Sequence, residues 1–295
     1  MSILISKDTK VLVQGITGKE GAKGAKAMLD YGTNVLCGVT PKKGGQEIEG
    51  KPVFNSITEA MAQFPEVNTS VVYVPPFAAK AAILEAVDNN ISLINVFVER
   101  IPIKDTAYCL AAAKERNIRI LGPSSLGLVV PGVGRLGVMG GPLVSEIFKP
   151  GSIGVISRSG GMSNELSWQL SQNGLGQSAT VHVGGDLLMG TTYADLLRLF
   201  QADEATKAVM IFGEHGGSYE FEIVDLINNK EYTKPLAMYI GGKFANVFPE
   251  GANIGHAGAI VGRGQSAEEK EAALLAVGVQ IADKYEDLAI LAKSF

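Results

Sequence analysis

The sequence has little of what marks a secreted, membrane-bound or nucleic-acid-binding protein. Among its 295 residues are two cysteines, Cys37 and Cys109, each alone in apolar company, which indicates buried thiols in a reducing compartment. The net charge is −4 with no basic run, so nucleic acid is not expected as a partner. No apolar run is long enough for a membrane span, and the N-terminus shows no signal-peptide pattern. We therefore expect a cytoplasmic protein that binds no membrane.

Glycine, by contrast, is abundant. The 36 glycines fall in short clusters that follow apolar runs, a placement typical of ligand-binding loops rather than flexible linkers. Hydrophobic residues make up 46% of the chain and charged residues 19%, as in a well-packed globular protein. A chain of 295 residues is long enough for two domains of ordinary size.

The first glycine cluster lies between an expected strand and an expected helix. Residues 10–14 form an apolar run, GITGKEG follows at 15–21, and a helical pattern continues to about Leu29. A strand, a glycine turn and a helix start together present free backbone N–H groups to a phosphate. The spacing is GxxGxxG and not the GxGxxG of dinucleotide enzymes, so the motif is weak by itself.

The second expected strand, 34–39, ends in TPKKGG. A NAD-binding domain would place Asp or Glu near this strand end to hold the ribose hydroxyls. Two lysines stand there instead, and lysine suits an additional phosphate, as in NADP or the 3′-phosphate of coenzyme A. A solvated lysine turn is the plainer alternative.

Strands and helices alternate along the rest of the chain, with polar and glycine-rich loops at the strand ends. Such alternation predicts an α/β fold with doubly wound parallel sheets. We divide the chain into a Rossmann-like domain at 1–125, a Gly/Pro-rich connector or small hairpin at 126–150, and a second, flavodoxin-like α/β domain at 151–295.

Three features of the second half are expected to converge at one sheet edge. Ser159, Gly160 and Gly161 open a helix, which is an anion site by geometry. Glu214 follows a strand, and His256 stands between small residues in GHAGAI, where a large group could approach its ring. Such an imidazole is a general base, a metal ligand or a nucleophile for a phosphoryl group, and no Cys, Asp or Glu at ligand spacing favours a metal. Singly, these features could be an N-cap, a solvated carboxylate and a glycine turn; together they favour phosphohistidine chemistry.

The motifs, in this order and spacing, resemble the α (small) subunit of the succinyl-CoA synthetase superfamily of acid–CoA ligases over nearly the whole chain. They are QGITGKEG, CGVTPKKGG, VPPF, GPSSLG, SRSGGMSNE, GGD, GEHGG and GHAGAI. The resemblance implies that His256 is phosphorylated, that Glu214 holds its imidazole, and that Ser159, Gly160 and Gly161 receive the phosphate. It also implies that coenzyme A binds the first domain through Gly15, Thr17, Gly18, Lys19, Glu20, Lys43, Phe97, Val98, Glu99 and Ser125.

The same resemblance implies a partner. An ATP-grasp β (large) subunit would supply ATP and Mg in a heterodimer or heterotetramer, in agreement with the lack of a GxxxxGK[ST] loop in this sequence. The small-molecule substrate would be a carboxylic acid, and no metal is expected in this chain.

Two loops depart from the pattern of succinyl-CoA synthetases. SRSGGMSNE stands where they carry SRSGTLTYE, and GPSSLG where they carry GPNCPG. SRSGGMSNE resembles the form of citryl-CoA synthetase and ATP-citrate lyase, in which Gly161 and Asn164 would give a tricarboxylate space and amide donors. We therefore expect citrate as the acid, with succinate as the alternative. A non-catalytic CoA-binding regulatory module and an NADP-dependent oxidoreductase are rivals from other classes; His256 and Glu214 argue against the first and the glycine spacing against the second.

Overall fold

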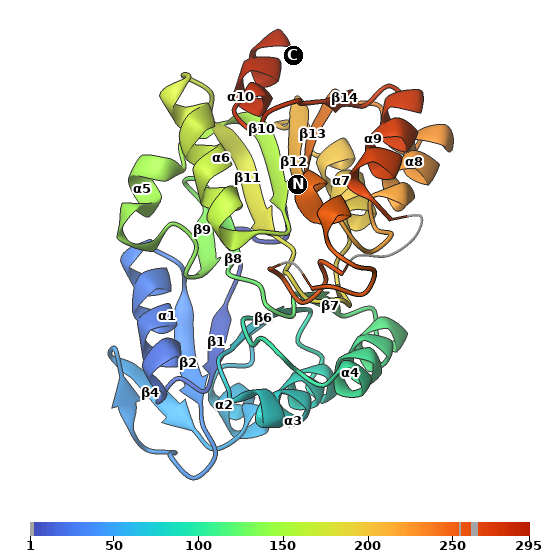
Figure 1. Ribbon diagram of the computed structural model, residues 1–295. Coiled ribbons are helices and arrows are strands. Elements are labelled where there is room, and N and C mark those ends of the chain that lie inside the picture. The colour runs from blue at the N-terminus through green and yellow to red at the C-terminus, as the bar shows by residue number, and fades with distance from the viewer. Residues whose placement is uncertain (1–2, 254, 261–264) are drawn as a thin grey trace.

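The computed structural model describes residues 3–253, 255–260 and 265–295 of the chain (Figure 1). Two α/β domains lie one above the other in that view, and each is built around a sheet of seven strands. The chain completes the lower domain before it enters the upper one.

The first sheet has the strand order β3-β4-β2-β1-β5-β6-β7. All its pairs are parallel except β3 with β4, and its central strands are buried on both faces. Sequential strands run outward in both directions from β1, so the sheet is doubly wound and Rossmann-like. Its strands are β1 (Val11–Gln14), β2 (Val35–Val39), β3 (Glu47–Ile48), β4 (Lys51–Phe54), β5 (Thr69–Val72), β6 (Leu93–Val96) and β7 (Arg119–Leu121).

Helices cover the two faces of this sheet unequally. On one face, α2 (Ile57–Gln63), α3 (Pro76–Asp88) and α4 (Ile103–Glu115) pack over Leu12, Cys37 and Ile94. On the other face lies α1 (Lys19–Asp30), whose Ala25 and Met28 belong to a core that continues into the second domain.

The second sheet has the order β14-β13-β12-β10-β11-β8-β9. Five strands are parallel in a flavodoxin-like order, and the antiparallel hairpin β8–β9 extends the sheet beyond β11. Its strands are β8 (Gly127–Val130), β9 (Gly134–Gly137), β10 (Pro150–Ser157), β11 (Gln177–His182), β12 (Ala208–Glu214), β13 (Leu236–Gly241) and β14 (Gln280–Ile281).

Two helices cover one face of this sheet, and three the other. The first face carries α6 (Gly160–Gln172) and α10 (Asp287–Leu291). The second carries α7 (Tyr193–Ala202), α8 (Phe221–Asn228) and α9 (Ala267–Ala276). The short α5 (Val144–Ile147) packs against α6.

The hairpin ties the two domains together. Leu128, Val130 and Leu136 share one apolar cluster with Val13 and Met28 of the first domain. Residues 126–150, expected to be a connector or a small hairpin, thus contain two strands that belong to the second sheet and pack on α1 of the first domain.

The expected α/β fold is confirmed, and the strands expected at 10–14 and 34–39 agree with β1 and β2 to within one residue. The sequence patterns did not reveal the short elements β3, β4, α2, α5, α8 and β14. Each spans eight residues or fewer, too short to show a clear period.

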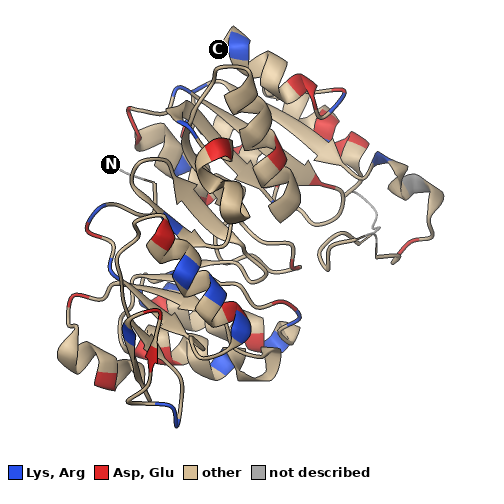
Figure 2. Ribbon diagram, turned by 90° about the vertical axis from the view of Figure 1, so that its left-hand side faces the viewer, with Lys and Arg blue, Asp and Glu red and all other residues tan. Residues whose placement is uncertain are grey.

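Charges are mixed over the molecule. Figure 2 shows acidic and basic positions interspersed along both domains rather than gathered into one face of a single sign. In the part of the chain that the structure describes, no helix combines the length and apolarity that crossing a membrane requires.

Candidate functional site

The candidate site lies where the parallel strands of the second sheet end. β10, β11, β12 and β13 are neighbours and run in one direction, so the loops that follow them meet at one edge. The loop after β13 leads to His256 and lies at the junction between the two domains (Figure 1).

His256 and Glu214 are in direct contact. The Nδ1 atom of His256 lies 2.6 Å from Oε1 of Glu214, the last residue of β12. An ionised carboxylate can only accept, so Nδ1 carries the proton and donates it, which leaves the lone pair on Nε2. The His256 side chain is 40% exposed and that of Glu214 only 11%. The carboxylate therefore holds the buried side of the ring, and the opposite side is accessible.

The hydrogen bond from His256 to Glu214 raises the pKa of the imidazole above its ordinary value of 6.5, while burial acts in the opposite direction. Arg158 lowers this pKa through its charge and Glu99 raises it, so a carboxylate of the first domain also acts on the ring. The hydrogen bond to Glu214 is thus the largest influence on this pKa, and it favours the charged form of the ring.

The other two histidines are unsuited to this chemistry. His182 is buried, its Nδ1 accepts from the Leu126 N–H, and its Nε2–H donates to the carbonyl of Arg158. Burial lowers the pKa of His182 to about 4. His215 is also buried, and burial lowers its pKa. His256 alone presents an accessible ring nitrogen, since all three histidines lie within the described ranges.

The loop that carries His256 is docked on the neighbouring loops. The Gly258 N–H donates to the Gly185 carbonyl, and the His256 ring packs so closely that a Cβ on Gly185 would lie 3.0 Å from it. A Cβ on Gly258 would lie 1.9 Å from Nη2 of Arg158, which itself donates to the Asp186 carbonyl. A side chain at Gly258 would thus force its neighbours to move, and one at Gly185 would be tight against the His256 ring.

The start of α6 lies at the same edge. Ser159 is its N-cap and accepts from the Met162 N–H at 3.5 Å, so the plain N-capping role exists alongside any anion site. A Cβ on Gly160 would collide with Leu126, whereas one on Gly161 would meet no heavy atom within 4 Å. The Asn164 amide oxygen accepts from the Gly140 N–H at 3.0 Å, so a structural contact already uses it.

The first domain has its own cavity at the carboxyl ends of β1, β2 and β5. It measures about 360 Å³ and is largely apolar, with the glycine turn at one side. Gly15 has a φ of +80° and a Cβ there would lie 2.4 Å from the Tyr73 carbonyl; a Cβ on Gly21 would lie 2.2 Å from the Gly15 carbonyl. These contacts explain two of the three glycines in the GxxGxxG spacing. The lining consists of Gln14, Gly15, Thr17, Gly18, Val39, Thr40, Pro41, Tyr73, Val74, Pro75, Ala78, Ala81, Ala82 and Glu85.

The structure brings some of the expected CoA-binding residues to this cavity and leaves others away from it. Gly15, Thr17 and Gly18 line it, whereas Lys19, Glu20 and Lys43 are exposed nearby in sequence and do not. Phe97, Val98 and Glu99 follow β6 on the far side of β5. Ser125 is buried, and its hydroxyl donates to the His182 carbonyl and accepts from the Gly127 N–H, so it is committed within the protein.

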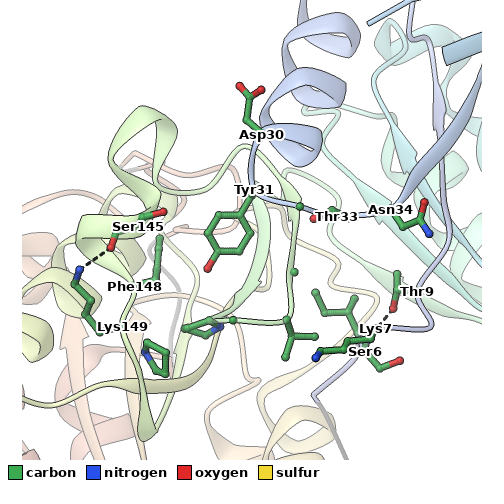
Figure 3. Close-up of a pocket in the computed structure, with 17 residues that line it drawn as sticks. Ser6, Lys7, Thr9, Asp30, Tyr31, Thr33, Asn34, Ser145, Phe148 and Lys149 are labelled. Atoms are coloured by element: carbon green, nitrogen blue, oxygen red, sulfur yellow. Dashed lines mark hydrogen bonds between the residues drawn. The ribbon is translucent and has the colours of Figure 1, made fainter. Parts of the chain in front are cut away.

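A cavity of about 950 Å³ lies elsewhere, between the N-terminal segment and the loop after α1, with the hairpin turn and the start of β10 as its other walls (Figure 3). Tyr31 and Lys149 stand in its wall, and the Lys149 amino group donates to the Ser145 carbonyl. None of the residues singled out from the sequence lines this cavity, which lies by the N-terminal ends of β1 and β2.

Sequence reasoning missed the buried charges around the site. Arg158 and Lys270 are both buried, and so is Glu220. One signal was available: Ala267, Lys270 and Leu274 follow the helical period on the buried face of α9, so a lysine stands on an apolar stripe. No comparable pattern pointed to Glu220.

Two family models match successive parts of the chain. The model of the CoA binding domain matches residues 6–100, and that of CoA-ligase matches residues 156–286. The α subunit of an ADP-forming succinate–CoA ligase from Aquifex aeolicus is 45% identical, covering 92% of this chain and 88% of its own. A second such α subunit, from Archaeoglobus fulgidus, is 42% identical over 95% of each chain.

Solved structures add two likenesses. An ATP citrate lyase from Methanothrix soehngenii, in complex with citrate and coenzyme A, superimposes with a TM-score of 0.91 at 25% identity. It covers 99% of this chain, but this chain spans only half of that one. A dinucleotide-forming acetyl-coenzyme A synthetase from Ca. Korarchaeum cryptofilum has a TM-score of 0.75 at 21% identity, which shows a common fold.

Proposed function

This chain belongs to the CoA-ligase family of ADP-forming acid–CoA ligases as an α-subunit homologue, and on that basis we propose that it works through phosphorylation of His256. The observation that carries the proposal is the 2.6 Å contact between His256 Nδ1 and Glu214 Oε1. It fixes one ring nitrogen as a donor and leaves the other as a nucleophile at the open side of the ring.

The proposed reaction divides one difficult step into three. Nε2 of His256 attacks the terminal phosphorus of ATP, which is held with Mg by an ATP-grasp β subunit, and ADP leaves. A carboxylate oxygen of the acid then takes the phosphoryl group, giving an acyl phosphate and regenerating the imidazole. The CoA thiol attacks the acyl carbonyl, its proton is lost, and phosphate leaves. Glu214 stabilises the charge on the ring, and the N–H groups at the start of α6 stabilise the phosphoryl oxygens.

The 360 Å³ cavity of the first domain is the proposed site for part of coenzyme A. Its apolar walls suit a flat ring system, and the glycine turn at its side offers backbone N–H groups to a phosphate. Lys19 and Lys43 remain proposed contacts for the outer phosphates, since they are exposed on the segments that border the cavity.

We propose succinate as the acid, in place of the citrate that the loop motifs favoured. Relatives between 41% and 45% identical are named for succinate, whereas the citrate lyase likeness stands at 25%. Citrate stays the second candidate on one observation, the open space around Gly161.

The test is CoA consumption by the complex of this chain with its co-expressed large subunit, with ATP and with succinate, citrate or malate in parallel. Preference for succinate supports the proposal, and preference for citrate would restore the interpretation of the SRSGGMSNE loop. A folded complex that is inactive with all three acids would favour a CoA-binding regulatory role instead.

His256 itself is tested with γ-labelled ATP. We expect His256→Asn to fold and assemble normally, because the side chain is partly exposed and contacts only Glu214 through its ring nitrogens, but to take up no label. Acid-labile, base-stable label on the wild-type chain and its loss in the variant are the expected results. Label retained by His256→Asn would exclude the phosphohistidine.

A further inference from the structure

Behind the His256–Glu214 contact lies a completely buried ion pair between Lys270 and Glu220. Lys270 comes from α9 and Glu220 directly precedes α8; both side chains are 0% exposed, and Nζ lies 2.6 Å from Oε2. Removing two charges from water costs free energy that their attraction often fails to offset. A buried pair of this kind is therefore weak evidence for stability, and its other contacts are informative.

Those contacts converge on the backbone of Glu214. Besides its ion pair with Glu220, the Lys270 ammonium donates to the Glu214 carbonyl at 2.6 Å and to the Gly216 carbonyl at 2.7 Å. The Glu214 N–H in turn donates to Oε1 of Glu220 at 3.4 Å. The pair thus holds Glu214 by its carbonyl oxygen and its N–H at the same time.

The side chain of Glu214 has little else to orient it. Its Oε1 accepts from His256, and its Oε2 is buried with no hydrogen-bond partner among the described residues. The direction of the carboxylate is therefore set by the backbone from which it projects. Gly216, whose carbonyl also accepts from Lys270, packs against Ile260 in the loop that carries His256, here called the histidine loop (residues 255–260). A Cβ on Gly216 would lie 2.8 Å from the Ile260 nitrogen.

We infer that Lys270 and Glu220 are positioning residues for phosphoryl transfer, which aim Glu214 at Nδ1 of His256 by fixing its backbone on both sides. The inference rests on the proposed phosphohistidine function and adds two residues to it. Neither side chain reaches the ring or the solvent, so both act through Glu214.

The test is the double variant Lys270→Met with Glu220→Met, studied in the intact complex with the large subunit. Replacing both partners leaves no unpaired buried charge, whereas a single replacement would leave one and endanger folding. We expect the rate of His256 labelling from γ-labelled ATP, and kcat with it, to fall about 10- to 100-fold, because small displacements of catalytic groups cost that much. The KM and Kd for CoA should stay unchanged, because the CoA cavity lies in the other domain.

Lys234→Met is the matched control. Its ammonium also donates to two backbone carbonyls, those of Phe200 and Asp203, each at 2.6 Å. It stands just before β13, at the opposite end of that strand from the histidine loop. We expect this variant to be labelled at the wild-type rate.

Labelling of the double variant at the wild-type rate would overturn the positioning role and leave the phosphohistidine intact. A fall in CoA affinity that matches the fall in labelling, or an equal loss in Lys234→Met, would also overturn it, since general damage would then explain the effect. If the wild-type complex takes up no label, the proposed function fails, and the positioning role fails with it.

Discussion

At the scale of single residues, the site assigns opposite protonation behaviour to two histidines of one sheet edge. Burial keeps His182 neutral, and both of its ring nitrogens form hydrogen bonds to the backbone. Glu214 favours the charged form of His256 and leaves one nitrogen in reach of a partner. The two histidines thus differ in their second ring nitrogen, which has a hydrogen-bond partner within the fold in His182 and none in His256 among the described residues.

This arrangement predicts a pH dependence for Glu214→Gln. Nε2 of His256 must be unprotonated to attack phosphorus, so the labelling rate should rise as the pH passes upward through the raised pKa, above 6.5. Removing the carboxylate charge lowers that pKa, and the midpoint of the rate profile should move to lower pH. The rate at high pH should fall, because the ring loses its charged partner.

The comparison variant is Glu231→Gln, which removes a surface carboxylate paired with Arg198. Its profile should coincide with that of the wild type. An unchanged midpoint in Glu214→Gln would show that the 2.6 Å contact does not govern the protonation of His256.

The same contact affects stability with a definite sign. A raised histidine pKa in the folded state contributes stability below the unfolded value of 6.5. That contribution is lost as the pH rises through the folded pKa, so the pair stabilises the resting fold most in mild acid.

At the scale of elements, the site consists of the loops that follow four parallel strands and meet at the carboxyl edge of the second sheet. The histidine loop docks through close backbone approaches, with Gly258 on the Arg158 guanidinium and the His256 ring on Gly185. The loop is therefore positioned by close packing, since a side chain at either glycine would fill the space between the loop and the residues it contacts.

Gly258→Ala tests this docking. The added methyl group would lie 1.9 Å from Nη2 of a buried arginine and 2.8 Å from the Asp186 carbonyl oxygen, so we expect the loop to move away and the His256–Glu214 contact to lengthen. We expect His256 labelling to fall at least about 10-fold, with CoA affinity unchanged. Stopped-flow or quench measurements of label uptake in the intact complex provide the readout.

Ala257→Ser, one residue earlier and exposed, is the control for Gly258→Ala. It adds one atom without meeting Arg158 and should label normally. Normal labelling of Gly258→Ala would mean that the loop reaches its reactive position without the close contact.

At the scale of the whole molecule, the two domains divide the proposed work. The first contains the apolar cavity and the glycine turn, the second the histidine and the helix start, and the β8–β9 hairpin packs both into one core. Glu99 of the first domain acts on the pKa of His256, which indicates that the two halves of the site face each other.

Ala78→Leu should separate the two activities. Ala78 lines the 360 Å³ cavity, so a larger side chain there reduces the space for coenzyme A. We expect CoA binding at least about 10-fold weaker, equivalent to about 1.4 kcal/mol, with His256 labelling from ATP unchanged. Calorimetric titration of the intact complex with CoA measures the first, and label uptake the second.

The same substitution at Ala107, exposed on the neighbouring helix α4, is the control and should bind CoA normally. Equal CoA affinity in wild type and Ala78→Leu would place coenzyme A outside this cavity.

The sequence by itself determined the fold class, the family and the residues of the phosphohistidine proposal. Strands with apolar runs, glycine clusters at their ends and helical periods are local signals, readable within ten or twenty residues. Glu214 and His256 stood out because each lies in a short distinctive motif after a strand.

Only the tertiary structure decided which side chains meet. Lys270 and Glu214 are 56 residues apart, and Asn164 and Gly140 are 24 apart, so neither contact leaves a mark on local periodicity. The packing of α9 against α8 and β13 brings the first two together, and the path of the chain before α6 brings the Gly140 N–H to the Asn164 oxygen. The sequence named the groups that we propose to react; which buried charges lie behind them depends on the packing of distant elements, which no local pattern encodes.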